Sequence, residues 1–205
     1  MKKIIALAAL AAISATASAA NLLTDGSFES ISQAAGTWNV YQGASLPGWT
    51  VTPSTHGLEV RNNVAGTAED GANFIELDGY ENDKISQSFA TVAGKSYEIT
   101  FFFADRSDVT SAFLQGSGGF AYTYTGAGTT TYTGSFGTGW HEAVIDFVAA
   151  GSSTSFSIWG VGKSDGYGTS FDNFSAVAVP EPATLGLFAA GLAVLGLSSR
   201  RRRQR

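Results

Sequence analysis

The chain has 205 residues, no cysteine and a formal net charge of −5 at pH 7. The lack of cysteine excludes disulfide bridges, thiol nucleophiles and thiolate metal sites. Seven of the twelve basic residues lie at the two ends, so residues 21–179 hold five basic residues against 16 carboxylates, a net charge of −11. A body this acidic repels nucleic acid and anionic lipid, and we expect no nucleic-acid partner.

The first 20 residues have the pattern of an export signal. Lys2 and Lys3 provide the positive start, residues 4–13 are apolar, and Ala-Ser-Ala at residues 17–19 is a small-residue cleavage site. An N-terminal core helix is the alternative, but it does not require these three features in this order. The sequence therefore predicts a signal peptide over residues 1–20.

Residues 21–179 are long enough for one domain with a core of its own. Apolar and polar residues alternate in several short segments, which is typical of half-buried strands, and glycine, aspartate and asparagine separate them. This spacing predicts an all-β fold, a single β-sandwich of the jelly-roll type. The turn at Ala93-Gly94 also predicts that two neighbouring segments form a hairpin. The expected strands lie within residues 73–79, 84–92, 95–105, 141–149, 154–160 and 171–179.

Residues 116–139 are rich in glycine, threonine and tyrosine. One interpretation is a hairpin of exposed strand-forming residues around a glycine turn. The other is a tyrosine platform for a sugar ring, because sugar C–H groups pack on aromatic faces and the tyrosine hydroxyl can hydrogen-bond. Trp38, beside Tyr41, is the best candidate for an exposed tryptophan, although core packing is the favoured role for each of the four tryptophans. The candidate ligand-binding residues are Trp38, Tyr41, Tyr122, Tyr124 and Tyr132.

The C-terminal 26 residues combine a Pro-Glu-Pro tripeptide, an uncharged apolar run and a cluster of arginines. A helix over about residues 183–199 would rise about 25 Å, slightly less than a ~30 Å hydrocarbon core. The arginines resist translocation, so we expect the body outside and the arginines in the cytoplasm. A core helix followed by a basic tail is the alternative. The residues that define this segment are Pro180, Glu181, Pro182, Arg200, Arg201, Arg202 and Arg203.

This tail, residues 180–205, resembles the PEP-CTERM sorting signal of Gram-negative bacteria. The resemblance implies that an exosortase processes the tail in the membrane. It also implies export through the inner membrane, a transient anchor there, and a final place at the cell surface or outside the cell.

The body resembles the choice-of-anchor C type of extracellular domain and, more distantly, jelly-roll carbohydrate-binding modules of the galactose-binding fold. The resemblance rests on NLLTDGSFES, LPGWTV, GANFIELDG, ISQSFATVAGKSYEITFFFA and FDNFSAVAV, while residues 111–139 depart from the pattern. It implies a structural Ca²⁺ held by Glu29 and Asp172, with Asp25 as a helper. The alternative is that these carboxylates cap turns or pair with a lysine.

The inventory of catalytic groups argues against an enzyme. His56 and His141 are not at metal-ligand spacing, and there is no Gly-x-Ser-x-Gly nucleophile elbow. We therefore expect a non-catalytic module that binds extracellular polysaccharide. The alternative is a structural or adhesive matrix (biofilm) protein that acts through protein contacts, and a glycan-active enzyme comes third.

Overall fold

The computed structural model describes residues 20–42, 46–53, 55 and 57–180. The predicted export signal and the predicted membrane-spanning tail lie outside these residues. Within the described ranges, no helix has the length and apolar character needed to cross a membrane.

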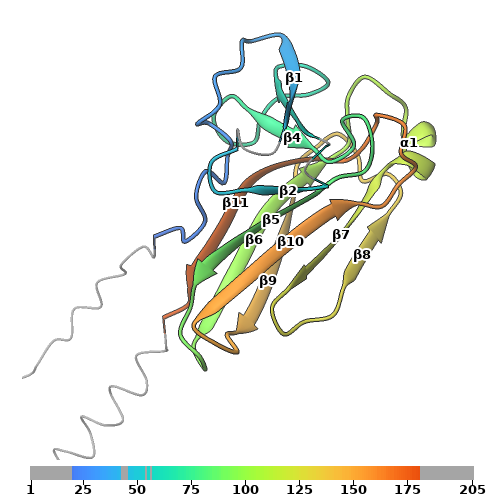
Figure 1. Ribbon diagram of the computed structural model, residues 1–205. Helices are drawn as coiled ribbons and strands as arrows, with labels where there is room; N and C mark the ends of the chain where they lie inside the picture. Colours follow the sequence, from blue (N-terminus) through green and yellow to red (C-terminus); the bar gives the residue numbers. More distant parts are fainter. Residues whose placement is uncertain (1–19, 43–45, 54, 56, 181–205) are drawn as a thin grey trace, which may run out of the picture.

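Two antiparallel sheets pack face to face (Figure 1), as the strand pattern predicted. The six-stranded sheet has the order β1-β3-β4-β11-β6-β9, and the five-stranded sheet has the order β2-β5-β10-β7-β8. One short helix, α1 (Ser111–Ser117), precedes β7. The strands are β1 (Thr37–Gln42), β2 (Thr50–Thr52), β3 (Gly57–Asn62), β4 (Phe74–Glu76), β5 (Lys84–Ala90), β6 (Ser96–Ala104), β7 (Gly119–Tyr124), β8 (Thr130–Thr133), β9 (His141–Val148), β10 (Ser153–Gly160) and β11 (Ser170–Ala178).

The core lies between the sheets and is rich in phenylalanine. Ile99 and Phe101 of β6 and Phe156 of β10 are fully buried, and the ring of Phe101 stacks on that of Phe174 with centroids 5.4 Å apart. Since side chains alternate across a strand, every second residue of these strands points into the sandwich. The alternation predicted for the segments that became β6, β9 and β10 is confirmed.

The hairpin predicted across Ala93-Gly94 is wrong. Strand β5 pairs with β2 and β10 in one sheet, whereas β6 pairs with β11 and β9 in the other. Residues 91–95 thus cross between the sheets. An alternating pattern shows which face of a strand is buried, and it does not reveal the strand's partner. The hairpin expected within residues 116–139 does form, from β7 and β8.

The first and last segments of the body lie side by side, as the resemblance implied. The Leu22 amide donates to the Ala176 carbonyl over 2.8 Å, and the Phe174 amide donates to the Gly26 carbonyl over 2.9 Å. A Cβ atom on Gly26 would lie 1.9 Å from the Phe174 carbonyl oxygen, so this approach requires glycine. The first and last described segments of the chain therefore lie next to each other on one side of the sandwich (Figure 1).

Candidate functional site

A groove of about 430 Å³ lies near β1 and the loops that precede β5 and β11. Three separate parts of the chain supply aromatic side chains to it, and a buried charged cluster adjoins it. Its lining residues are Trp38, Glu59, Gly79, Tyr80, Arg106, Asp165, Gly166 and Tyr167.

The aromatic side chains of the groove are exposed to solvent. Trp38 on β1 is 49% exposed, Tyr80 after β4 is 69% exposed, and Tyr167 before β11 is 37% exposed. Large aromatic rings usually bury most of their surface, so a group of exposed rings around one hollow is typical of a binding surface. The exposure of Trp38 departs from the core packing favoured for each tryptophan and agrees with the choice of Trp38 as the best candidate for an exposed ring. Its role in binding stays a prediction.

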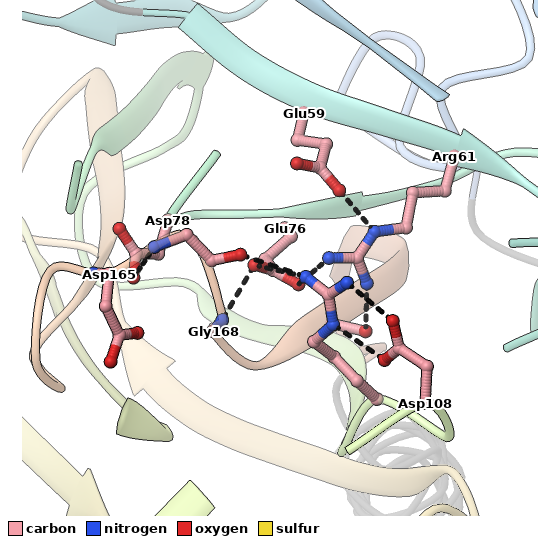
Figure 2. A network of polar contacts seen from close by, with 10 residues as sticks. Glu59, Arg61, Glu76, Asp78, Asp108, Asp165 and Gly168 are labelled. Atoms are coloured by element: carbon pink, nitrogen blue, oxygen red, sulfur yellow. Dashed lines mark hydrogen bonds and ion pairs between the residues drawn. The ribbon is translucent and has the colours of Figure 1, made fainter. Parts of the chain in front are cut away.

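Glu76 is the centre of the charged cluster and is fully buried (Figure 2). It forms ion pairs with Arg61 and with Arg106, whose Nη1 lies 3.2 Å from Glu76 Oε2, and it accepts a hydrogen bond from the Gly168 amide over 2.7 Å. Arg61 Nε donates to Glu59 Oε1 over 2.5 Å. Burial lowers the pKa of Arg61 to about 10. A buried guanidinium needs such partners, because an unpaired charge in the interior is costly.

Arg106 holds one wall of the groove. Its Nε and Nη2 donate to Asp108 over 2.9 Å each, and its Nη1 donates to the Gly166 carbonyl over 3.0 Å. The guanidinium carbon lies 4.6 Å from the centroid of the Tyr167 ring, a cation–π contact. These contacts fix the Tyr167 side chain before any ligand arrives.

Asp78 holds the backbone of the same loop in place. Its Oδ2 accepts from the backbone amides of Asp165 and Gly166 over 3.0 and 3.1 Å. Burial raises the pKa of Asp78, although these amide hydrogen bonds oppose the shift. Asp78 and Asp83 are both buried, although they lie in a loop rich in polar residues.

The other predicted ligand-binding residues lie away from the groove. The Tyr41 hydroxyl donates to Gln33 Oε1 over 2.8 Å, and the ring packs on the core. Tyr122 and Tyr124 are half-buried and pack against core phenylalanines, while Tyr132 is 39% exposed and stacks on Phe120. Alternation along β7 directs its tyrosines inward and its threonines outward, so the structure does not gather these tyrosines with Trp38.

Two further hollows are less suited to a ligand. One of about 460 Å³ includes Trp140. The Nε1 of this residue donates to the Thr67 carbonyl and its ring packs edge-on against Phe74, so contacts within the protein hold the ring in place. The other, of about 400 Å³, lies on the outer face of the five-stranded sheet and holds a single aromatic residue, Trp159.

Two of the residues predicted to hold calcium, Glu29 and Asp172, form hydrogen bonds to the loop of residues 69–73. Glu29 Oε1 accepts from the amides of Ala72 and Asn73, and Asp172 Oδ2 accepts from the amides of Glu69 and Asp70, over 2.7 to 3.0 Å. Asp25 Oδ1 accepts from the Ser30 amide. Calcium needs six to eight oxygen ligands, and in the described part of the chain no three acidic or histidine side chains form a group that could hold a metal. The observed contacts attach this loop, and calcium binding stays a prediction.

Asp172 is nevertheless an unusual carboxyl group. It is fully buried, and burial raises its pKa from 3.8 to about 7, against the opposing effect of its amide hydrogen bonds. A carboxyl group with this pKa changes its charge close to neutral pH.

Comparison with known proteins places each of the two parts of the chain in a family. Residues 21–175 match the family described as protein of unknown function DUF642. The chain belongs to this family. Residues 178–203 match the PEP-CTERM protein-sorting motif, which confirms the recognition of the tail and marks the protein for export and membrane-anchored sorting. No curated protein matches the chain.

Solved structures share the jelly-roll fold of this DUF642 body. The arabinose-bound α-L-arabinofuranosidase MgGH51 has a TM-score of 0.50 and 17% identity over 78% of this chain and 26% of its own. A protein described as Family 16 Carbohydrate Binding Module-2 has a TM-score of 0.49 and 18% identity, over 77% of this chain and 99% of its own. The module TmCBM61, solved with β-1,4-galactotriose, has a TM-score of 0.46 and 14% identity, over 78% and 99%. At these identities the likeness concerns the fold alone.

Proposed function

We propose that this DUF642 protein is a non-catalytic carbohydrate-binding protein of the Gram-negative cell surface or extracellular matrix, and that it binds exopolysaccharide. The observation that carries the proposal is the groove in which Trp38, Tyr80 and Tyr167 remain exposed next to a buried ionic cluster. Sugar rings present C–H faces that pack on aromatic rings, and their hydroxyl groups hydrogen-bond to nearby carboxylates.

The rigidity of the groove supports binding. Arg106 fixes Tyr167, and Asp78 fixes the backbone of residues 165–166, so these parts lose little freedom when a ligand is bound.

Binding without catalysis is part of the proposal. Hydrolysis of a glycosidic bond uses a pair of carboxyl groups that flank the bond, one of which must donate a proton. Around the groove, Glu59 is paired with Arg61, Glu76 with two arginines, and Asp108 with Arg106. Each of these carboxylates is therefore paired with an arginine in the ionic cluster, and we propose no catalytic role for it.

The test uses the full chain, purified in a detergent without a sugar headgroup, and the exopolysaccharide of the producing bacterium. We expect saturable binding that Trp38→Ala and Tyr80→Ala each weaken about ten-fold, equivalent to about 1.4 kcal/mol. Both side chains are exposed, so the melting temperature should hardly change. Trp159→Ala is the matched control, because Trp159 lies in a separate hollow on the outer face of the five-stranded sheet.

Two results would overturn the proposal. If Trp159→Ala removed binding and the groove variants did not, the site would lie on the sheet face. If no polysaccharide bound, carbohydrate recognition itself would be refuted.

A structural matrix role is the second candidate, and strand β9 favours it. This strand is an edge of the six-stranded sheet, and Val144 and Val148 on its outer face are 53% and 63% exposed. Exposed apolar residues on an edge strand promote association between sheets. Sedimentation of the full chain would show concentration-dependent oligomers that Val144→Lys disperses. A monomer at all concentrations would reject this role.

A further inference from the structure

The charges of the groove favour one class of sugar. Among the residues that line it, Glu59 and Asp165 are acidic and Arg106 is basic. Arg106 directs Nε and Nη2 to Asp108, and Nη1 to Glu76 and the Gly166 carbonyl. It therefore has few donors left for a ligand, and a carboxylate on the ligand would find no free bidentate partner there.

The two acidic residues of the groove keep negative charge that the protein only partly neutralises. The Glu59 side chain is 6% exposed, one of its oxygens binds Arg61, and the other points away from that guanidinium (Figure 2). Asp165 Oδ2 accepts from Ser117 Oγ over 2.8 Å and lies 3.5 Å from Nζ of the exposed Lys163, while its Oδ1 is buried without a hydrogen-bond partner. An exposed ion pair such as the one with Lys163 has a small interaction energy, so Lys163 offsets little of the negative charge of Asp165.

A positively charged amine interacts favourably with both the carboxylates and the aromatic rings of the groove. It makes charge-assisted hydrogen bonds to carboxylates, and it is attracted to the faces of tryptophan and tyrosine rings, of which tryptophan attracts cations most strongly. A neutral acetamido group can donate one N–H to a carboxylate, but it carries no positive charge and so lacks both the ion pair and the cation–π attraction. A uronic acid would bring its own negative charge to a body that already carries −11 over residues 21–179.

We infer that the groove selects glycans whose sugar units carry free, positively charged amino groups, and that it discriminates against N-acetylated and uronic acid units. This inference rests on the proposed function, and it goes further by naming the chemical class that the groove prefers. The residues that decide the preference are Glu59, Asp165 and Trp38.

The experiment compares three hexasaccharides on the full chain in the same detergent: β-1,4-linked glucosamine, its fully N-acetylated form, and β-1,4-linked glucuronic acid. We expect the glucosamine oligomer to bind at least ten-fold more tightly than either of the others. Its affinity should fall with added salt, because salt screens charges, and should fall again once the pH rises above the pKa of the ligand's amine.

Asp165→Asn tests the assignment, and Asp146→Asn is its matched control. Both variants change the net charge by one unit, but Asp146 is an exposed residue of β9, outside the groove lining. We expect Asp165→Asn to lower the affinity for the glucosamine oligomer at least five-fold and to leave the affinity for the N-acetylated oligomer unchanged. Asp146→Asn should alter neither affinity. The backbone amide of residue 165 still binds Asp78 in this variant, so the loop should keep its place.

The possible failures are distinguishable. Equal or tighter binding of the N-acetylated or glucuronic acid oligomer would overturn the amine preference and leave carbohydrate binding in place. Equal loss in Asp165→Asn and Asp146→Asn would overturn it as well, since the attraction would then be to the charge of the whole body. Failure of all three oligomers and of the native exopolysaccharide would refute both the inference and the proposed function.

Discussion

The buried carboxyl group of Asp172 should make the stability of the body depend on pH. Its pKa is about 7 in the folded protein, against an ordinary value of 3.8. Since the folded state holds this proton more tightly than the unfolded state does, the contribution is fully present below about pH 4. It is lost as the pH rises through 7. A difference of about three pKa units at 1.36 kcal/mol each gives about 4 kcal/mol as an order of magnitude.

The assay is urea denaturation of the full chain in detergent, followed by tryptophan fluorescence from pH 4 to pH 8. The free energy of unfolding of the wild type should fall across this range by up to about 1.4 kcal/mol per pH unit from Asp172 alone. Asp172→Asn cannot ionise, so we expect it to lose this part of the slope, while the exposed Asp146→Asn keeps it. Identical slopes in the wild type and Asp172→Asn would refute the reasoning, because Asp172 would then ionise as an ordinary carboxyl group.

Thermal melting of the same two proteins, the wild type and Asp172→Asn, tests calcium binding. A bound Ca²⁺ would hold Glu29 and Asp172 in their charged forms, and it would raise the melting temperature at pH 7 in the wild type but not in Asp172→Asn. An unchanged midpoint on addition of either calcium or a chelator would remove Glu29, Asp172 and Asp25 from the metal assignment. The amide contacts of Glu29 and Asp172 would then be sufficient to explain why these carboxylates are present.

Two further substitutions test the fold around the groove and the termini. Glu76→Gln leaves Arg61 buried with one partner fewer, and we expect it to lower the free energy of unfolding by roughly 3–5 kcal/mol in urea denaturation; a loss below 1 kcal/mol would show that the cluster is not a buried ionic centre. Gly26→Ala places a Cβ atom against the Phe174 carbonyl oxygen, and it should prevent accumulation of folded protein in a protease-resistance assay. Gly128→Ala meets open space and should behave as the wild type; equal resistance of the two variants would contradict the packing described for the termini.

The sequence by itself determined which residues of several strands face the core and that the tail is a sorting signal. Alternation in the segments that became β6, β9 and β10 correctly assigned their inward residues, because the period of a strand is a local property of the chain. The PEP-CTERM tail was recognisable for a similar reason, since its tripeptide, apolar run and arginines follow one another directly.

Only the tertiary structure decided which strands pair and which loops meet. Strands β5 and β6 are neighbours in sequence but lie in different sheets, and Tyr80 and Tyr167 join Trp38 from loops that are far apart along the chain. Neither tyrosine lies in a recognisable motif. The signal that could have indicated the site was Arg61, a charged residue inside a strand whose residues are all buried, because it requires carboxylate partners from elsewhere. Such partners are brought together by sheet topology, which depends on contacts between distant residues and so cannot be obtained from a local pattern.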